Sequence, residues 1–161
     1  MKKPLKHLSA ALVLVSAASH AATDKLGDAT VSVTVNAKTG FELVIDKAFE
    51  MTEGDEAKAQ VIGSMKNTST LPVTYYLKSN GVREDDKGVT VDLTDENGTT
   101  LPNALIVYGY ESRGSVVDDH AEGTLEPGAT DRVVGTQTAS QAASMTAGNW
   151  TGQLEYGVVT P

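Results

Sequence analysis

The chain has 161 residues, enough for one domain with a buried core, and its 13 Lys and Arg against 21 Asp and Glu give a formal charge of −8. This acidic balance disfavours binding to nucleic acid or to an anionic membrane through a basic surface. The chain contains no Cys, which excludes disulfides, thiolate metal sites and cysteine nucleophiles. No apolar run reaches the roughly 18 residues of a membrane span, so we expect a globular domain.

The first 21 residues have the pattern of a secretory signal peptide. A positive stretch precedes a short apolar run, and small residues follow it: Lys2, Lys3 and Lys6, then residues 8–18, then Ser19, His20 and Ala21. This order predicts export and cleavage after Ala21. Because two of the three histidines leave with the leader, the exported chain would keep only His120, and a multi-histidine metal site is excluded.

Apolar and polar residues alternate along most of the remaining chain, which is typical of strands with one buried face. Turn residues separate these runs, which are residues 29–37, 41–45, 59–66, 71–78, 89–94, 101–110, 131–137 and 150–159. Residues 111–123 are expected to form a loop, and residues 138–145 to add one or two helical turns. The spacing predicts an all-β antiparallel sandwich of immunoglobulin-like type.

Catalytic and metal-binding patterns are nearly absent. His120 follows Asp118 and Asp119, a run that we interpret as a solvated loop rather than as part of a Ser-His-Asp triad. Two acidic clusters lack the alternating pattern of a calcium loop: Glu53, Asp55 and Glu56, and Glu84, Asp85 and Asp86. Three Asn-X-Ser/Thr triplets, at Asn67, Asn97 and Asn149, are interpreted as accidental. We therefore predict no enzyme activity, no cofactor and no metal.

The two ends of the exported chain are more informative. Residues 29–37 begin shortly after the cleavage site, and the last strand has no strand after it to pair with, so one sheet edge would stay open. A neighbouring molecule could fill that edge with its own N-terminal strand, using the face formed by Ala29, Val31, Val33, Val35 and Ala37. Burial of the three valines alone would contribute about 5–9 kcal/mol. Since the donating strand and the accepting groove are different surfaces, such contacts extend into a filament.

Here the sequence resembles a known family. The run of residues 146–152, Thr-Ala-Gly-Asn-Trp-Thr-Gly, followed by an alternating strand, is similar to the ending of chaperone–usher pilins. Together with the alternating residues 31–35 it most resembles the alpha-clade colonization-factor major pilins, which also lack a disulfide. The resemblance covers the leader, residues 22–46 and residues 142–161, whereas residues 51–145 match only in strand rhythm.

The resemblance implies an incomplete immunoglobulin-like antiparallel β-sandwich with an N-terminal donor strand. It divides the chain into a signal peptide (residues 1–21), a donor-strand segment (22–38) and a pilin domain (39–161). Ala29, Val31, Val33, Val35 and Ala37 would then be the donor residues, and Trp150, Leu154 and Tyr156 would line the accepting groove or its adjoining core. A periplasmic chaperone would cap the subunit, and an outer-membrane usher would assemble it into an adhesive cell-surface fimbria, a homopolymer that can carry a separate tip adhesin. The host receptor stays open.

Two other classes of protein remain. A self-contained periplasmic or cell-surface immunoglobulin-like binding module would have the same leader and strands, but it would fold alone and stay monomeric. An exported hydrolase on a β-sandwich would need clustered carboxylates, and the sequence singles out no such pair.

Overall fold

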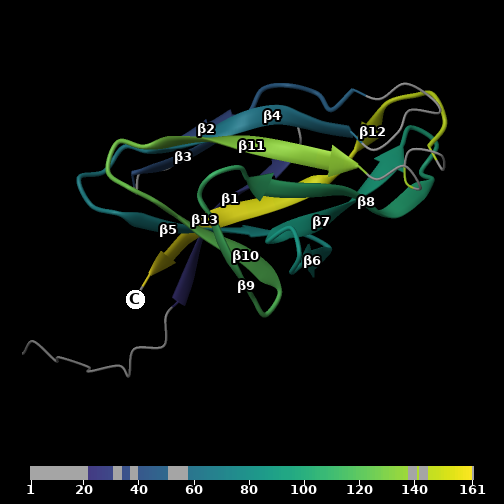
Figure 1. Ribbon diagram of the computed structural model, residues 1–161. Helices are drawn as coiled ribbons and strands as arrows, with labels where there is room; N and C mark the ends of the chain where they lie inside the picture. The colour runs from purple at the N-terminus through teal and green to yellow at the C-terminus, as the bar shows by residue number, and fades with distance from the viewer. Residues whose placement is uncertain are drawn as a thin grey trace, which may run out of the picture.

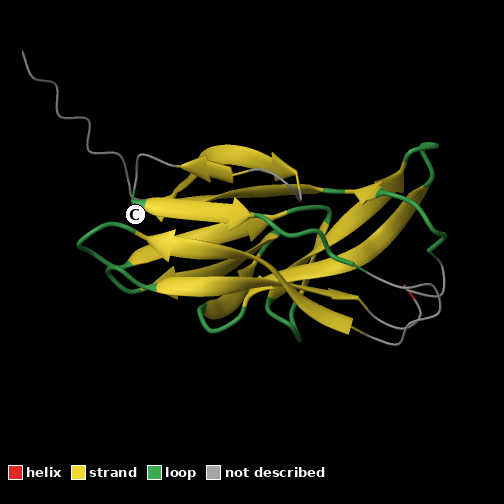
Figure 2. Cartoon of the chain, turned by 90° about the horizontal axis from the view of Figure 1, so that it is seen from above, coloured by secondary structure: helices red, strands yellow, loops and turns green. Residues whose placement is uncertain are grey.

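Two antiparallel sheets form the protein (Figures 1 and 2). The structure, a computed structural model, describes residues 22–30, 34–36, 40–50, 58–137, 141 and 145–160. A five-stranded sheet has the order β1-β13-β5-β10-β9, and an eight-stranded sheet has the order β12-β7-β8-β11-β4-β3-β2 with β6 beside β7. In the described part of the chain, no helix is long and apolar enough to cross a membrane.

The strand bounds are as follows. The five-stranded sheet contains β1 (Ala22–Thr30), β13 (Gln153–Thr160), β5 (Val73–Lys78), β10 (His120–Leu125) and β9 (Arg113–Val117). The eight-stranded sheet contains β12 (Trp150–Thr151), β7 (Gly88–Asp95), β8 (Thr100–Gly109), β11 (Thr130–Gln137), β4 (Lys58–Asn67), β3 (Phe41–Ile45), β2 (Thr34–Asn36) and β6 (Gly81–Arg83).

The core lies between the two sheets, and strands such as β3 turn alternate residues into it. On β3, Phe41, Leu43 and Ile45 are buried, whereas Glu42 and Val44 between them are half-buried. The Phe41 ring stacks on Tyr75 of the opposite sheet, with ring centroids 5.4 Å apart. The prediction of an all-β fold built from antiparallel sheets is therefore confirmed.

Two local predictions need correction. Residues 111–123, expected as a loop, form most of a hairpin in which β9 pairs with β10 around Asp118, whose φ is 52°. Their strand signal is weak because Val116 and Val117 are adjacent and Gly114 and Gly123 interrupt the alternation. Of residues 29–37, expected as one strand, residues 29–30 belong to β1 and residues 34–36 to β2, and these two strands lie in different sheets; the other residues of this range lie outside the described residues. The short helix expected over residues 138–145 falls mostly outside the described residues.

Gly152 carries the chain from one sheet to the other, since β12 before it belongs to the eight-stranded sheet and β13 after it to the five-stranded sheet. The crossing is tight. A Cβ at this position would lie 2.4 Å from Cγ1 of Val91 and 2.8 Å from the backbone oxygen of Asp92. A residue without a side chain is therefore required where the last strand begins.

We predict that Gly152→Ala lowers the free energy of unfolding by roughly 1–3 kcal/mol, because the added methyl group overpacks the core beside Val91. Urea unfolding followed by tryptophan fluorescence measures this change. Gly114→Ala is the matched control, since its nearest neighbour is the Glu122 oxygen at 3.1 Å and the crowding is milder. Equal losses in the two variants would contradict the account of the crossing.

Candidate functional site

The outer edge of β13 is the site to which the sequence points. On one side β13 pairs with β5, and on the other it pairs antiparallel with β1 of the same chain. Three residues of β13 face the core: Leu154, Tyr156 and Val158 are 3%, 0% and 7% exposed. The edge that the sequence predicts to be open is therefore covered in the single chain, because a bare edge would leave backbone groups without partners.

Small or charged residues of β1 stand opposite the core residues of β13. Opposite Leu154, Tyr156 and Val158 stand Ala29, Gly27 and Asp24. None of these three is a large apolar residue. The register also shifts between Lys25 and Gly27, which marks a β-bulge in β1. The three positions of β1 opposite the core residues thus hold no large apolar residue, and Leu26, the one large apolar residue in the sequence of β1, is the extra residue of the bulge.

Tyr156 connects this edge to the rest of the core. Its ring lies 6.2 Å from the Phe41 ring, centroid to centroid, at an angle of 55°. Phe41 in turn stacks on Tyr75, so the three aromatic rings link β13, β3 and β5 across the interior. Burial raises the pKa of Tyr156, and it raises the pKa of Tyr75 to about 12.

The structure separates the predicted donor residues. Ala29 lies on β1 opposite Leu154, whereas Val35 lies on β2 opposite Leu43 of the eight-stranded sheet. Val31, Val33 and Ala37 lie outside the described residues.

The predicted groove residues are also divided between the sheets. Leu154 and Tyr156 are on β13, directly at the edge in question. Trp150 is on β12, opposite Asp95 of β7, where it packs half-buried against the core and donates from Nε1 to the Thr146 oxygen over 3.0 Å. Trp150 therefore belongs to the adjoining core rather than to the edge itself.

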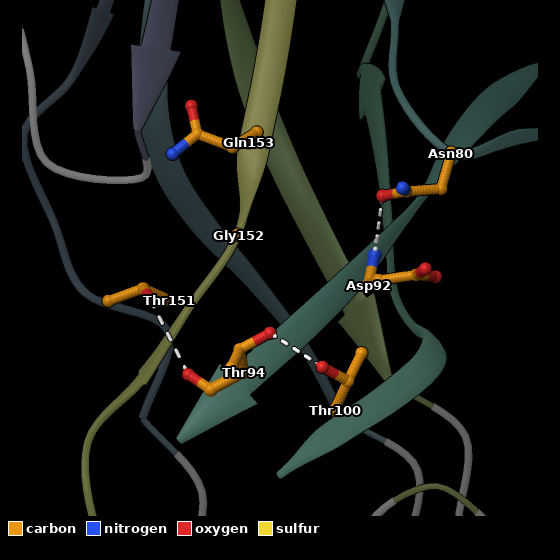
Figure 3. A pocket seen from close by; sticks show the side chains of 7 residues that line it. All are labelled: Asn80, Asp92, Thr94, Thr100, Thr151, Gly152 and Gln153. Carbon is orange, nitrogen blue, oxygen red and sulfur yellow. Dashed lines mark hydrogen bonds between the residues drawn. The ribbon is translucent and has the colours of Figure 1, made fainter. Parts of the chain in front are cut away.

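A polar hollow opens where β13 begins (Figure 3). Its volume is about 300 Å³, and its lining side chains come from the β5–β6 connection and from β7, β8, β12 and β13: Asn80, Asp92, Thr94, Thr100, Thr151 and Gln153. No sequence motif indicated this hollow, because its residues are dispersed along the chain and meet only through strand pairing.

Hydrogen bonds within the hollow fix its walls. Asn80 Oδ1 accepts from the Asp92 backbone N–H over 3.0 Å, and the hydroxyls of Thr94 and Thr100 lie 3.0 Å apart across β7 and β8 (Figure 3). Asp92 Oδ1 accepts from the Asn103 backbone N–H over 2.7 Å. The hollow thus presents small polar side chains with defined positions.

His120 lies between two carboxylates. Its Nδ1 lies 3.2 Å from Asp119 Oδ1 and its Nε2 lies 3.1 Å from Glu122 Oε1, so both ring nitrogens have carboxylate partners. The ring also meets Tyr76 edge-on, with centroids 5.7 Å apart. The solvated loop expected here is in fact the start of β10, and the imidazole is only 12% exposed. The contact with Tyr76 joins β10 to β5, whereas the two carboxylate contacts are local to β10 and the turn before it.

One member of the acidic clusters and one of the three Asn triplets have clear structural contacts. Asp86 pairs with Arg83 at 3.1 Å in the β6–β7 turn, while residues 53–56 lie outside the described residues. Among the described residues, no group of three His, Cys, Asp or Glu could hold a metal ion. Asn67 is fully buried, and its amide donates to the Leu71 and Leu125 oxygens over 2.8 and 2.9 Å, which leaves it no access to a modifying enzyme.

A buried carboxylate that the sequence did not reveal anchors the β9–β10 hairpin. Asp131 is 4% exposed and accepts hydrogen bonds from the backbone N–H groups of Glu111, Ser112 and Arg132 and from the Ser112 hydroxyl. Burial acts to raise the pKa of Asp131, but these donors outweigh it and the pKa falls below its usual range. Ser112 also meets the Tyr75 hydroxyl at 2.9 Å, which ties the hairpin to the core.

Comparison with protein-family models, with curated proteins and with solved structures finds no match to this chain. The function must therefore be argued from the residues and their geometry.

We predict that Asp131→Asn lowers the free energy of unfolding at pH 7 by roughly 1–3 kcal/mol, since it removes the charge that four donors stabilise. The folded-state pKa of Asp131 is lowered, so its contribution is present above the unfolded pKa of about 3.9 and is lost as the pH falls through the folded value. The gap between wild type and variant should therefore shrink in acid.

Urea unfolding at neutral and strongly acidic pH measures this effect. Asp118→Asn in the exposed β9–β10 turn is the control, because Asn tolerates the positive φ at that position. A wild-type advantage over Asp131→Asn that stays constant down to low pH would refute the role given to the carboxylate.

Proposed function

We propose that this protein is a structural subunit of an adhesive surface fimbria, a pilin of the chaperone–usher type, which polymerises by donor-strand exchange. The observation that carries the proposal is the register of β1: Ala29, Gly27 and Asp24 stand opposite the core residues Leu154, Tyr156 and Val158. A strand with no large apolar residue at these three positions is a weak cover for such an edge. A better strand would displace it.

The chain itself contains the better strand. If the N-terminal segment of a neighbour lies along β13 so that its Val35 takes the place of Ala29, its Val33 comes opposite Tyr156 and its Val31 opposite Val158. Three valines then replace Ala, Gly and Asp, and their burial is worth about 5–9 kcal/mol. At these three positions the burial favours the exchanged register, and it is offset in part by the pairing of Val35 opposite Leu43 that the segment gives up.

The exchanged segment would leave its own domain at Gly40, whose φ is 82° and which directly precedes β3. Both β1 and β2 would then move out together, in agreement with a donor segment of residues 22–38. Residues 36–40 span roughly 15 Å at about 3.3 Å per residue, enough to bridge from one domain to the next. On this proposal the remaining domain is an incomplete immunoglobulin-like sandwich.

The proposal includes the route that the pilin resemblance implies. The subunit would be secreted through the inner membrane, capped in the periplasm by a chaperone and passed to an outer-membrane usher, which assembles it into the cell-surface fimbria. Neighbouring copies of the chain are its main partners. The proposal assigns no host receptor to this subunit and leaves that role open to a tip adhesin.

The second candidate is a self-contained immunoglobulin-like binding module of the periplasm or cell surface. The pairing of β1 with β13 within one chain favours it, because a completed edge needs no neighbour. The two candidates differ in their response to concentration: a module stays monomeric, whereas a strand-exchanging subunit forms multimers.

A charge on the apolar face of the donor segment separates them. Val33→Asp should abolish filaments, because the carboxylate would come opposite Tyr156 in the core of the accepting domain. Ser32→Asp is the matched control, since Ser32 lies on the alternate face of the same segment, and it should polymerise as wild type. Size exclusion and electron microscopy of the exported chain after prolonged incubation at high concentration measure the outcome.

Two results would count against the proposal. Filaments from Val33→Asp as abundant as those of wild type would show that the valine face is not the donor. A wild-type chain that stays monomeric at every concentration, alone and with its cognate chaperone and usher, would favour the self-contained module.

A further inference from the structure

The two ends of the molecule differ in a way that gives an assembly a direction. We call the end where β13 begins the hollow end; it carries the Thr-lined hollow around Thr151 and Gln153. We call the opposite end the exit end; it carries Gly40 and the loop of residues 67–71. In Figure 1 the hollow end lies on the right, near β12, and the exit end on the left, near the C-terminus.

Strand direction determines which ends meet. β13 runs from the hollow end towards the exit end, because it starts at Gln153 and its Val158 pairs with Tyr75 near the start of β5. A donor strand antiparallel to it runs the other way, so its last residues lie at the hollow end of the accepting molecule. Since those residues lead to Gly40, the exit end of the donor faces the hollow end of the acceptor.

The exit end presents one prominent apolar side chain. Leu71 is 70% exposed, the most exposed large hydrophobic residue of the described chain. The loop that displays it is held firmly: the Leu71 oxygen accepts from the Asn67 amide over 2.8 Å and from the Ser69 hydroxyl over 2.6 Å. A rigid loop loses little conformational entropy when its tip is buried.

This loop is attached to the point where the donor segment leaves. The Thr68 backbone N–H donates to the Gly40 oxygen over 2.6 Å, and a Cβ on Gly40 would lie 2.6 Å from Ser69 Cβ. Gly40 and the loop therefore move as one piece. Where the donor segment enters a neighbour, the loop that carries Leu71 is therefore held within the span of residues 36–40, roughly 15 Å, of the entry point.

From these observations we infer that the Leu71 loop of one molecule packs into the Thr-lined hollow of the next copy, forming a second contact beside the exchanged strand. The inference rests on the proposed function. The hollow, about 300 Å³, lies at the start of the strand that receives the donor, and Thr94, Thr100 and Thr151 offer methyl groups as well as hydroxyls. The occupant is a second copy of this chain.

A different hinge would give a different assembly. If β1 alone were exchanged and β2 stayed on β3, the donor would leave its domain at Thr34, which pairs with Val44 towards the hollow end. Two hollow ends would then face each other, and mutual exchange would close a dimer. The position of the hinge therefore decides between a closed pair and an open, head-to-tail filament.

Chemical cross-linking distinguishes these arrangements, and the absence of native Cys makes the chain suitable for it. In the full chain carrying Leu71→Cys and Thr151→Cys, a short bismaleimide should link the polymer into a ladder of covalent multimers. Val61→Cys with Thr151→Cys is the control. Val61 is exposed in the middle part of β4, opposite Val134 and away from both ends, so this pair of cysteines should give no ladder. Thr151→Cys alone should remain unlinked.

Each outcome decides the matter. Polymers that form but show no Leu71–Thr151 ladder would overturn the docking of Leu71 and leave strand exchange intact. Dimers linked through Thr151→Cys alone would overturn the head-to-tail direction. A chain that never forms multimers would overturn the proposed function and this inference with it.

The contact should also contribute measurably to assembly. Leu71→Asn is expected to raise the concentration at which polymers form by about tenfold or more, since the burial of a Leu side chain is lost. Val61→Thr, which changes a 37% exposed residue away from both ends, should leave that concentration unchanged. Equal effects of the two substitutions would contradict a specific contact at Leu71.

Discussion

The structure depends on the covering of one strand edge. β13 carries Leu154, Tyr156 and Val158 into the core, and Tyr156 reaches Phe41 of the opposite sheet, so this strand joins both layers. Its outer edge needs a partner, and the single chain supplies β1, whose opposing residues are Ala, Gly and Asp. The large core residues of β13 face no large apolar residue at the paired positions of β1. This contrast underlies the proposal that a neighbour provides the better strand.

Other features of the molecule position β13 or would set the direction of the proposed assembly. Gly152 lets the chain cross tightly between sheets and start β13, and it places the hollow beside that start. Asn67 donates a hydrogen bond to the loop that displays Leu71. Asp131 anchors the β9–β10 hairpin, which lies on the far side of β5 from β13 in the five-stranded sheet. On this proposal, one end of the molecule would receive a neighbour's strand, and the other end would deliver one together with the exposed Leu71.

Much of the fold was predictable from alternation alone. Residues 41–45 bury every second residue, and residues 89–94 bury the three apolar residues of their alternation, with Thr90 buried between two of them. The hairpin of β9 and β10 was not predictable from alternation, because Gly114, Gly123 and the adjacent valines interrupt the alternating pattern. Pairing between the two strands, rather than the local pattern, makes these residues strands. The pilin resemblance placed Trp150, Leu154 and Tyr156 in one group, the accepting groove or its adjoining core, but it could not divide them between β13 and β12, because that division depends on the crossing at Gly152. The hollow and the Asp131 cluster escaped prediction because their members are far apart in the chain.

The most direct test locates the neighbours of Tyr156 in the assembled protein. Solid-state NMR on a polymer grown from a mixture of valine-labelled and tyrosine-labelled chains reports only contacts between molecules. The account predicts an intermolecular contact between Val33 and Tyr156. Assemblies in which Tyr156 contacts no valine of another chain, and Gly27 of the same chain stays opposite it, would contradict the exchange of strands.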